Sequence, residues 1–310
     1  MQCKDNKNYD ADLLLRIFVE TDDFCKLFEP WYASSPMVQN TADLPQVSTR
    51  KRRAPGLCAS EVMTILIYYH HSGYKCFEYY YKALVVLSFK DSFPKLVSYN
   101  RFIELLPRAK YHLLMFGQWL AHQEERKGIF IIDSKKLPVC HNRRIAQNKT
   151  FEGFAARGKA STGWFYGLKI HLIINHLGGI VRFKLTPANV ADNNVELLRE
   201  LFDNLHGKVV GDLGYLTKFF QEFYEQGVQI ITRLRSNMKN KLMDFKDKLL
   251  LKKRPIIEAV NDILMSVCDI EHTRHRSPIN AICHIWASIV AYHYLPNKPA
   301  IILEKLTNIL

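Results

Sequence analysis

Two short apolar runs, each ending in an aspartate, constrain the fold of this chain more than any other feature. Ile129–Ile132 leads into Asp133, and Val209–Gly211 leads into Asp212. A continuous apolar run of this length is typical of a strand that is buried on both faces of a sheet. Two such strands lying side by side would hold the two carboxylates a few ångströms apart at the rim of the sheet.

Strand and helix patterns alternate through the middle of the chain. We expect strands over Phe165–Asn175 and Ile180–Leu185, joined by a hairpin loop, and then a helix that Asp192 caps. The polar, basic segment between Asp133 and Gly163 is expected to be a loop. Further expected elements are a helix over Thr217–Gln226, a strand over Val228–Leu234 and a helix over Ile256–Val267.

This order of elements predicts an α/β fold, in which a sheet of mixed strand direction is flanked by helices. The same order occurs in the ribonuclease H-like fold, an analogy that does not fix a function. Residues 1–125 have helical patterns, which fit a helix-turn-helix-like DNA-binding domain as well as an all-helical bundle of another purpose. We therefore expect an all-helical domain over residues 1–125, a ribonuclease H-like domain over residues 126–296 and a C-terminal tail over residues 297–310.

Positive charge is concentrated in two segments. The chain carries +13 from 43 Lys plus Arg against 30 Asp plus Glu, and residues 126–186 hold twelve basic residues against two acidic ones. Residues 233–254 hold nine against two. Such clustering indicates binding to a polyanion. A membrane is disfavoured as the partner, because the longest apolar stretch, Ile279–Leu295, is too short to span and contains His284 and His293.

A third acidic residue, Glu258, lies in the first turn of the helix expected over Ile256–Val267. If this helix folds over the strand ends, three carboxylates converge on one edge, and such hard oxygen ligands suit Mg²⁺ or Mn²⁺. Two divalent ions can activate an attacking oxygen and stabilise a leaving oxygen in phosphodiester cleavage. The structural alternatives are that each aspartate caps a turn and that Glu258 is a solvated acid favoured by the helix dipole.

Several motifs, occurring in the same order, resemble the DDE transposases of bacterial insertion sequences. They are Ile132-Asp133-Ser134, Gly163–His171, Thr186–Val190, Gly211–Tyr215, Ile256–Glu258 and Ile270–Ser277. The resemblance covers roughly residues 129–296. It implies a DNA transposase in which Asp133, Asp212 and Glu258 form a catalytic triad that binds Mg²⁺, with Mn²⁺ as a substitute. It also implies double-stranded DNA as the partner, namely the terminal inverted repeats of an element and the target DNA.

The chain departs from the pattern that related transposases carry around the last acidic residue. Arg254 and Glu258 occupy the second and third places of a Tyr, Arg, Glu, Lys pattern, but the Tyr place holds Leu251 and the Lys place holds Met265. The phosphate contacts expected from that lysine are therefore in question.

Ten side chains are candidates for contact with DNA. Lys169 and His171 alternate on one expected strand and share a face, although a histidine packed among its neighbours is the commoner case. Trp164 and Tyr166 could stack an unpaired base or pack in the core. Several of the cations would also suit a solvated loop or helix face. The candidates are Arg143, Arg144, Arg157, Lys159, Lys169, His171, Lys252, Arg254, Arg274 and Arg276.

The favoured hypothesis is a transposase that cleaves at the ends of its element and transfers the freed 3′-hydroxyl to target DNA, as a dimer when two ends are joined. The alternatives are a ribonuclease H-like nuclease without strand transfer and a catalytically inactive DNA-binding protein. Seven scattered cysteines without a C-x-x-C pair predict a reduced, cytoplasmic protein. The resemblance to transposases implies that it is associated with the bacterial nucleoid. Cys268, His272, His275 and Cys283 form a zinc-like set whose spacing matches no standard zinc motif.

Overall fold

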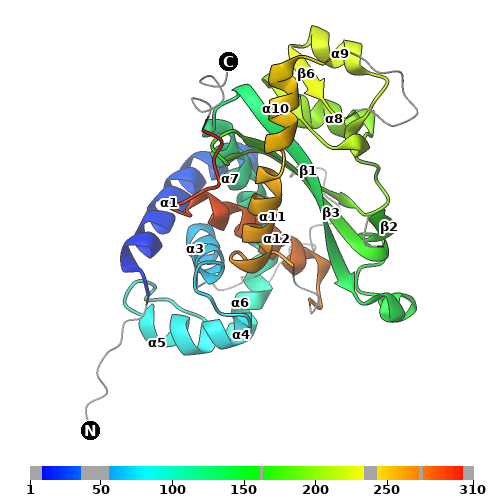
Figure 1. Ribbon diagram of the computed structural model, residues 1–310. Coiled ribbons are helices and arrows are strands. Elements are labelled where there is room, and N and C mark those ends of the chain that lie inside the picture. Colours follow the sequence, from blue (N-terminus) through cyan, green and yellow to red (C-terminus); the bar gives the residue numbers. More distant parts are fainter. Residues whose placement is uncertain (1–8, 36–55, 161–162, 234–242, 272–274, 303–310) are drawn as a thin grey trace. The chain divides into compact units, whose positions relative to one another are not determined.

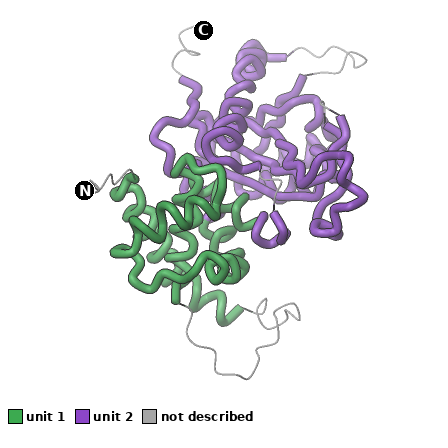
Figure 2. Tube along the Cα trace, turned by 90° about the horizontal axis from the view of Figure 1, so that it is seen from below, with its two compact units in different colours: residues 1–116, 282–291 green, residues 117–281, 292–310 purple. Residues whose placement is uncertain are grey.

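The computed structural model describes residues 9–35, 56–160, 163–233, 243–271 and 275–302 (Figure 1). The chain forms two compact units, coloured separately in Figure 2. Unit 1 consists of residues 1–116 with 282–291, and unit 2 of residues 117–281 with 292–310. Unit 1 thus takes in a segment from near the C-terminus, a division that differs from the expected boundary after residue 125.

Unit 1 is helical. Its elements are α1 (Ala11–Ser34), α3 (Ala59–Tyr69), α4 (Phe77–Tyr80), a π-helical turn (Tyr81–Val85), α5 (Val86–Ser88), α6 (Tyr99–Leu105), a 3-10 turn (Leu106–Ala109), the first half of α7 (Lys110–Gln123) and the middle of α12 (Pro278–His293). The side chain of Asp10 caps α1 by accepting a hydrogen bond from the Leu13 N–H at 2.9 Å. Such a cap satisfies one of the N–H groups left unpaired at a helix start.

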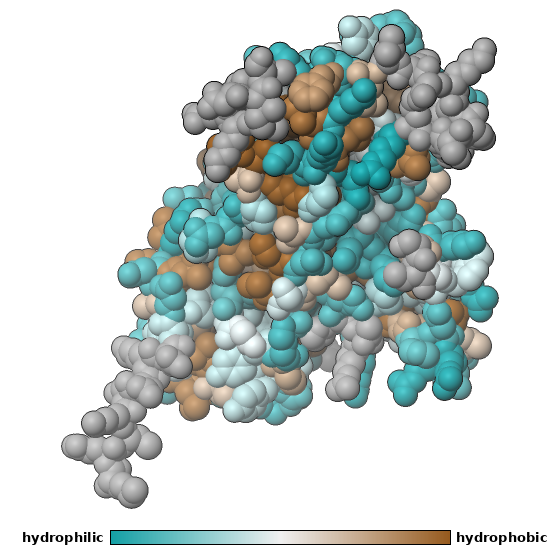
Figure 3. Space-filling view, viewed as in Figure 1, coloured by the Kyte–Doolittle hydropathy of each residue, from teal (hydrophilic) through white to brown (hydrophobic). Residues whose placement is uncertain are grey.

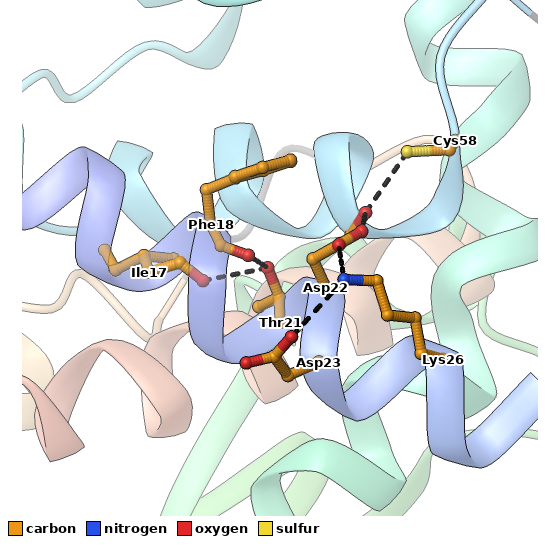
Figure 4. Close-up of polar contacts among 8 residues, drawn as sticks. Ile17, Phe18, Thr21, Asp22, Asp23, Lys26 and Cys58 are labelled. Carbon is orange, nitrogen blue, oxygen red and sulfur yellow. Dashed lines mark hydrogen bonds and ion pairs between the residues drawn. The ribbon is translucent and has the colours of Figure 1, made fainter.

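Polar contacts join α1 to α3. The buried hydroxyls of Thr21 and Thr64 lie 3.0 Å apart, and Asp22 accepts a hydrogen bond from Ser60 at 2.9 Å. Asp22 also pairs with Lys26 one turn later on α1, at 2.8 Å (Figure 4). The Thr21–Thr64 and Ser60–Asp22 contacts fix the register of α1 against α3, whose facing surfaces are otherwise apolar.

Unit 2 contains a six-stranded sheet of mixed direction. The strands are β1 (Lys127–Cys140), β2 (Ala156–Ala160), β3 (Gly163–Asn175), β4 (Ile180–Pro187), β5 (His206–Val210) and β6 (Val228–Ile231). Their order is β2-β3-β1-β5-β6, and β4 pairs with β3 as well. β1 runs antiparallel to β3 and parallel to β5, and β5 runs parallel to β6. β2 pairs with the first part of β3 and β4 with the remainder.

Helices flank this sheet. They are α8 (Val195–Phe202), α9 (Phe220–Glu225), α10 (Phe245–Lys253) and α11 (Ile256–Ser266). Phe130 and Ile132 of β1 pack in one core with Leu198 of α8 and Phe223 of α9. Because side chains alternate along a strand, Ile131 and Asp133 face away from that core. The helix α11 packs on β1 (Figure 1).

Two expectations about local structure are wrong. In its described part, the segment between Asp133 and Gly163 is a loop only over residues 141–155, because β1 continues to Cys140 and β2 spans Ala156–Ala160. The long strand β3 supplies the pairing partner for both. Asp192 does not cap α8; the cap is Asn194, whose side chain accepts from the Leu197 N–H at 3.0 Å.

The other expected elements are present, with shorter bounds for α9 and β6. Leu234, the expected end of β6, lies outside the described residues. A mixed sheet flanked by helices, with a helical N-terminal region, agrees with the expected α/β class. Among the described residues, no helix combines the length and apolar character needed to cross a bilayer.

Candidate active site

The parallel pairing of β1 with β5 places two aspartates at equivalent positions. Ile131 pairs with Val210, and each aspartate follows two residues later, Asp133 within β1 and Asp212 after the end of β5. Neighbouring strands lie about 4.8 Å apart. The two side chains therefore stand at the same level of the sheet, although β1 continues beyond its aspartate. One Asp212 oxygen also caps the following turn, accepting from the Gly214 N–H at 2.8 Å.

Burial dominates the environment of Asp133. It raises the pKa of the Asp133 carboxyl to about 6, and the charges of Asp212 and Asp192 act in the same direction. The positive charge of Arg254 and the Ser134 N–H lower that pKa, but by less. A carboxylate crowded by like charges is favoured in its ionised form only when a cation is near. Asp133 therefore lies at a place that a cation would stabilise.

Two residues of the α10–α11 segment, Arg254 and Asn261, act on Asp133. Arg254, Glu258 and Asn261 follow one another at spacings of four and three residues, so they share a helix face. The Asn261 amide is buried and donates from Nδ2 to Asp133 Oδ2 at 3.0 Å. Arg254 contributes the largest opposing charge effect on Asp133 and pairs with Glu258 at 2.5 Å. Glu258, whose side chain is 54% exposed, thus lies on this face between two residues that act on Asp133.

Asp192 is a fourth acidic residue at this place, and the sequence pattern did not mark it as a site residue. Its Oδ2 and the Asp212 Oδ1 both approach Gly214, at 3.6 and 2.9 Å from the point where a Cβ would stand. The Asp192 carboxylate also raises the pKa of Asp133 and of the fully buried Tyr215 hydroxyl, for which burial is the larger cause. Asp192 lies in the loop just before α8, where an aspartate usually caps the helix, so the sequence indicated a cap and not a residue of the acidic site.

Lys169 and His171 hold Asp192 from β3. The Lys169 ammonium, 12% exposed, donates to Asp192 Oδ1 at 3.1 Å and to the Val190 carbonyl at 3.0 Å. The fully buried His171 ring lies 3.8 Å from Asp192 Oδ1 and 3.0 Å from the Thr186 hydroxyl. Burial lowers the pKa of His171 to about 4, so the ring is neutral. Neither side chain is placed for direct phosphate contact; both support a carboxylate.

The other candidates for DNA contact are spread over unit 2. Arg143, Arg144, Arg157 and Lys159 are exposed and lie on the turn after β1 and on β2. Lys252 is exposed near the end of α10, and Arg276 is exposed just before α12. Arg274 lies outside the described residues.

The zinc-like set is not assembled in the described part of the chain. Cys268 and Cys283 are both buried, and the Cys283 thiol donates to the Leu106 carbonyl at 3.4 Å. His272 lies outside the described residues.

The donor chemistry of the acidic site fits Mg²⁺ or Mn²⁺. Asp133, Asp212 and Glu258 offer only carboxylate oxygens, and the buried Oδ1 of Asn261 has no hydrogen-bond partner among the described residues. All are hard donors that suit these ions. Among the described residues, no three His, Cys, Asp or Glu side chains are already gathered closely enough to hold a metal. The Arg254 guanidinium supplies the positive charge next to Glu258 instead.

Comparison with known proteins matches the same part of the chain. The family model of the transposase DDE domain matches residues 123–278, about half of the 310 residues. The matched region contains all three expected acids together with Asp192 and Asn261. No curated protein and no solved structure matches the chain.

Proposed function

Because the chain belongs to the transposase DDE domain family, we propose that it is a DNA transposase whose catalytic acids are Asp133, Asp212 and Glu258. One observation supports the assignment of the acids: Glu258 lies on the same helical segment as Asn261, which donates a 3.0 Å hydrogen bond to Asp133, and Arg254, whose charge acts on Asp133. The parallel register of β1 and β5 brings Asp212 to the same level. We propose that this sheet has the ribonuclease H-like arrangement.

Each acid has a defined support. Asn261 holds one oxygen of Asp133, the turn at Gly214 holds one oxygen of Asp212, and Arg254 holds Glu258. Each carboxylate keeps a second oxygen for a ligand. When bound, Mg²⁺ or Mn²⁺ would supply Lewis-acid stabilisation of the attacking and leaving oxygens of a phosphodiester. The Arg254 guanidinium, which lies beside Glu258, is well suited to a phosphate.

The basic side chains supply the surface for double-stranded DNA. Arg143, Arg144, Arg157 and Lys159 are exposed at one end of the sheet, and Lys252 is exposed near the end of α10, just before α11. Arg276 adds a charge beyond α11. Such contacts bind the backbone of any duplex and set its position on the protein. Recognition of inverted repeats would need two ends in one complex, for which a dimer is the simplest assembly.

The test uses the DNA that flanks the coding region. Duplexes carrying its terminal inverted repeats are incubated with the protein and Mg²⁺, and a second set carries a pre-cut 3′-hydroxyl end with a target plasmid. We expect cleavage in the first experiment and joined strands in the second. Cleavage without joining would instead identify a nuclease.

Asp133→Asn and Glu258→Gln should reduce cleavage by at least a hundredfold, because each removes a charge from the metal site. Asp262→Asn is the matched control, since Asp262 is an exposed carboxylate on α11 whose nearest ion pair, to Lys135, is 3.9 Å long. Asp133→Asn cleaving at the wild-type rate would overturn the assignment.

A further inference from the structure

The end of the sheet formed by β2 and the first part of β3 has one packed face and one open face. On the packed face Phe165 is 4% exposed, and a Cβ on Gly158 would lie 2.2 Å from the Ala188 carbonyl oxygen. On the open face Trp164 is 64% exposed. Burying an indole is favourable, so an exposed tryptophan on a strand is not explained by folding.

Cations surround this tryptophan on the same face. Lys159 pairs directly with Trp164 in the β2–β3 register, and Arg157 pairs with Tyr166, so these four alternate residues lie on one side. Within the described residues, neither Arg157 nor Lys159 forms an ion pair, and the same holds for Arg143 and Arg144 on the adjacent turn. Figure 3 shows hydrophilic side chains gathered at this end of the sheet.

A cavity of about 530 Å³ opens beside the indole. It is lined by Asn142, Ile145, Arg157, Trp164 and Phe165. The Asn142 side chain donates to the Trp164 carbonyl at 2.7 Å, which ties the turn Asn142–Gln147 to the start of β3. A volume of this size is in the range of pockets for small planar ligands. The turn and the strand that line the cavity are therefore held together by the fold itself.

Tyr166 does not share this role. Its hydroxyl donates to the Phe151 carbonyl at 3.2 Å, and its ring packs against the cluster that contains Val139 and Phe151. The tyrosine supports the loop between β1 and β2, whereas Trp164 on the same face is 64% exposed. Core packing, one of the two alternatives for this pair, thus applies to Tyr166 alone.

We propose that Trp164 and the cavity beside it bind an unpaired base of single-stranded DNA, with Arg157 and Lys159 holding the phosphates on either side. An aromatic ring and a guanidinium bind the flat face of a base, and that face is covered by neighbouring bases in an intact duplex. Stacking of this kind tolerates any base sequence. The proposal rests on the proposed function for its choice of DNA as the ligand.

The base would lie away from the acidic site. Leu172 of β3 pairs with Asp133, and Trp164 lies eight residues earlier on the same strand. At roughly 3.3 Å per residue this is a separation of roughly 26 Å. The ligand is therefore an unpaired stretch several nucleotides from the phosphate at the acids, in flanking or target DNA that is opened during the reaction.

The test measures binding of the full chain to labelled oligothymidylate and to a matched duplex, by fluorescence anisotropy in EDTA at fixed salt. Trp164→Ala should weaken binding to the single strand about tenfold and change duplex binding less than twofold. Trp164→Phe should keep most of the affinity. Trp31→Ala, which removes an indole 54% exposed in unit 1, should bind both DNAs as the wild type does.

Wild-type affinity of Trp164→Ala for the single strand would overturn the proposal, and so would an equal loss for single strand and duplex. If Trp164→Ala has a lowered melting temperature, the comparison between Trp164→Phe and Trp164→Leu decides, because both keep bulk and only one keeps an aromatic face. Because EDTA removes metal, the result does not depend on cleavage. A chain that passes this test and never cuts DNA would refute the proposed function and leave the stacking site standing.

Discussion

At the scale of single residues, Asn261 has an unusual position. It is 2% exposed on the apolar face of α11, where the other buried residues are Ile257, Val260 and Leu264. Its Nδ2 donates to Asp133, while its buried Oδ1 has no hydrogen-bond partner in the part of the chain that the structure describes. A buried amide with one unsatisfied group costs free energy that an apolar residue would avoid. The amide is therefore better explained by the site than by stability.

We predict that Asn261→Leu reduces the metal-dependent cleavage rate about tenfold and leaves the melting temperature within a few degrees of the wild type. The leucine fills similar space and removes both amide groups, so folding loses little. Asp133 loses the donor that orients it. Single-turnover cleavage and thermal melting measure the two effects, with Asp262→Asn as the control. A large fall in melting temperature with an unchanged cleavage rate would contradict this role.

His71 gives a pH dependence of stability. Burial lowers the pKa of this histidine from 6.5 to about 4. The unfolded chain therefore binds a proton between these values that the folded chain does not, and the free energy of unfolding falls as pH drops from about 6.5 to 4. Below pH 4 both states are protonated and this contribution is constant. The loss is about 3 kcal/mol over the interval.

The expected result is that His71→Gln flattens this part of the stability curve in urea titrations at pH 7 and pH 4.5. The comparison must be with the wild type, because Asp133, with its raised pKa, contributes in the opposite direction between about pH 4 and 6. Parallel curves for the variant and the wild type would show that His71 does not carry the effect.

At the scale of elements, the close approach of β1 and β5 depends on two glycines. Gly128 pairs with Gly207, whose φ is +138° and where a Cβ would lie 2.0 Å from the Gly128 carbonyl oxygen. The strand pairing that begins at these glycines continues to Ile131 and Val210, and it sets Asp133 level with Asp212. A side chain at this point would push the two strands apart.

We predict that Gly207→Ala lowers the free energy of unfolding by at least ~3 kcal/mol, because an unfavourable φ adds to a clash with backbone. Gly153→Ala is the control: its φ is +79°, but nothing lies within 4 Å of the added carbon, so we expect a loss of only ~1 kcal/mol. Urea denaturation compares the two. Equal losses of unfolding free energy would mean that the close approach of β1 to β5 does not exclude a side chain at Gly207.

Local sequence patterns predicted the strands and helices whose own residues show an apolar run or a helix start. The apolar runs before Asp133 and Asp212 are strands, and the helix after Pro255 runs from Ile256 to Ser266, as expected. The second half of β1 was missed because Lys135 and Lys136 resemble a polar loop, although Leu137 and Val139 are buried in alternation. Its partner, β3, supplies the pairing from a distant part of the sequence, which no local pattern records.

The same limit applies to the site. Asp133, Asp212 and Glu258 could be proposed because each occupies a recognisable place in an element. Asp192 and Asn261 could not be proposed, because their importance comes from residues that are distant in the sequence. Asn261 contacts Asp133, which is 128 residues away, and Asp192 pairs with Lys169, which is 23 residues away. The sequence marked Trp164 as a residue that could stack a base or pack in the core, and only its exposure in the structure favours base stacking.

At the scale of the whole molecule, the net charge of +13 predicts binding to duplex DNA that weakens with salt. We expect the slope of log affinity against log salt concentration to become less steep by about 3 to 4 when Arg143, Arg144, Arg157 and Lys159 are all replaced by Ala, since each phosphate contact contributes about 0.9. Anisotropy titrations from 50 to 200 mM salt would measure this. An unchanged slope would place the DNA-binding surface elsewhere.

The strand β3 is hydrogen-bonded on both sides, by β1 on one and by β2 followed by β4 on the other. A strand paired on both sides resists bending, so the distance between its two ends is fixed. If the first end holds an unpaired base and the middle lies beside the cut phosphate, the count of nucleotides between them is a constant of the protein, the same for every DNA sequence that it processes.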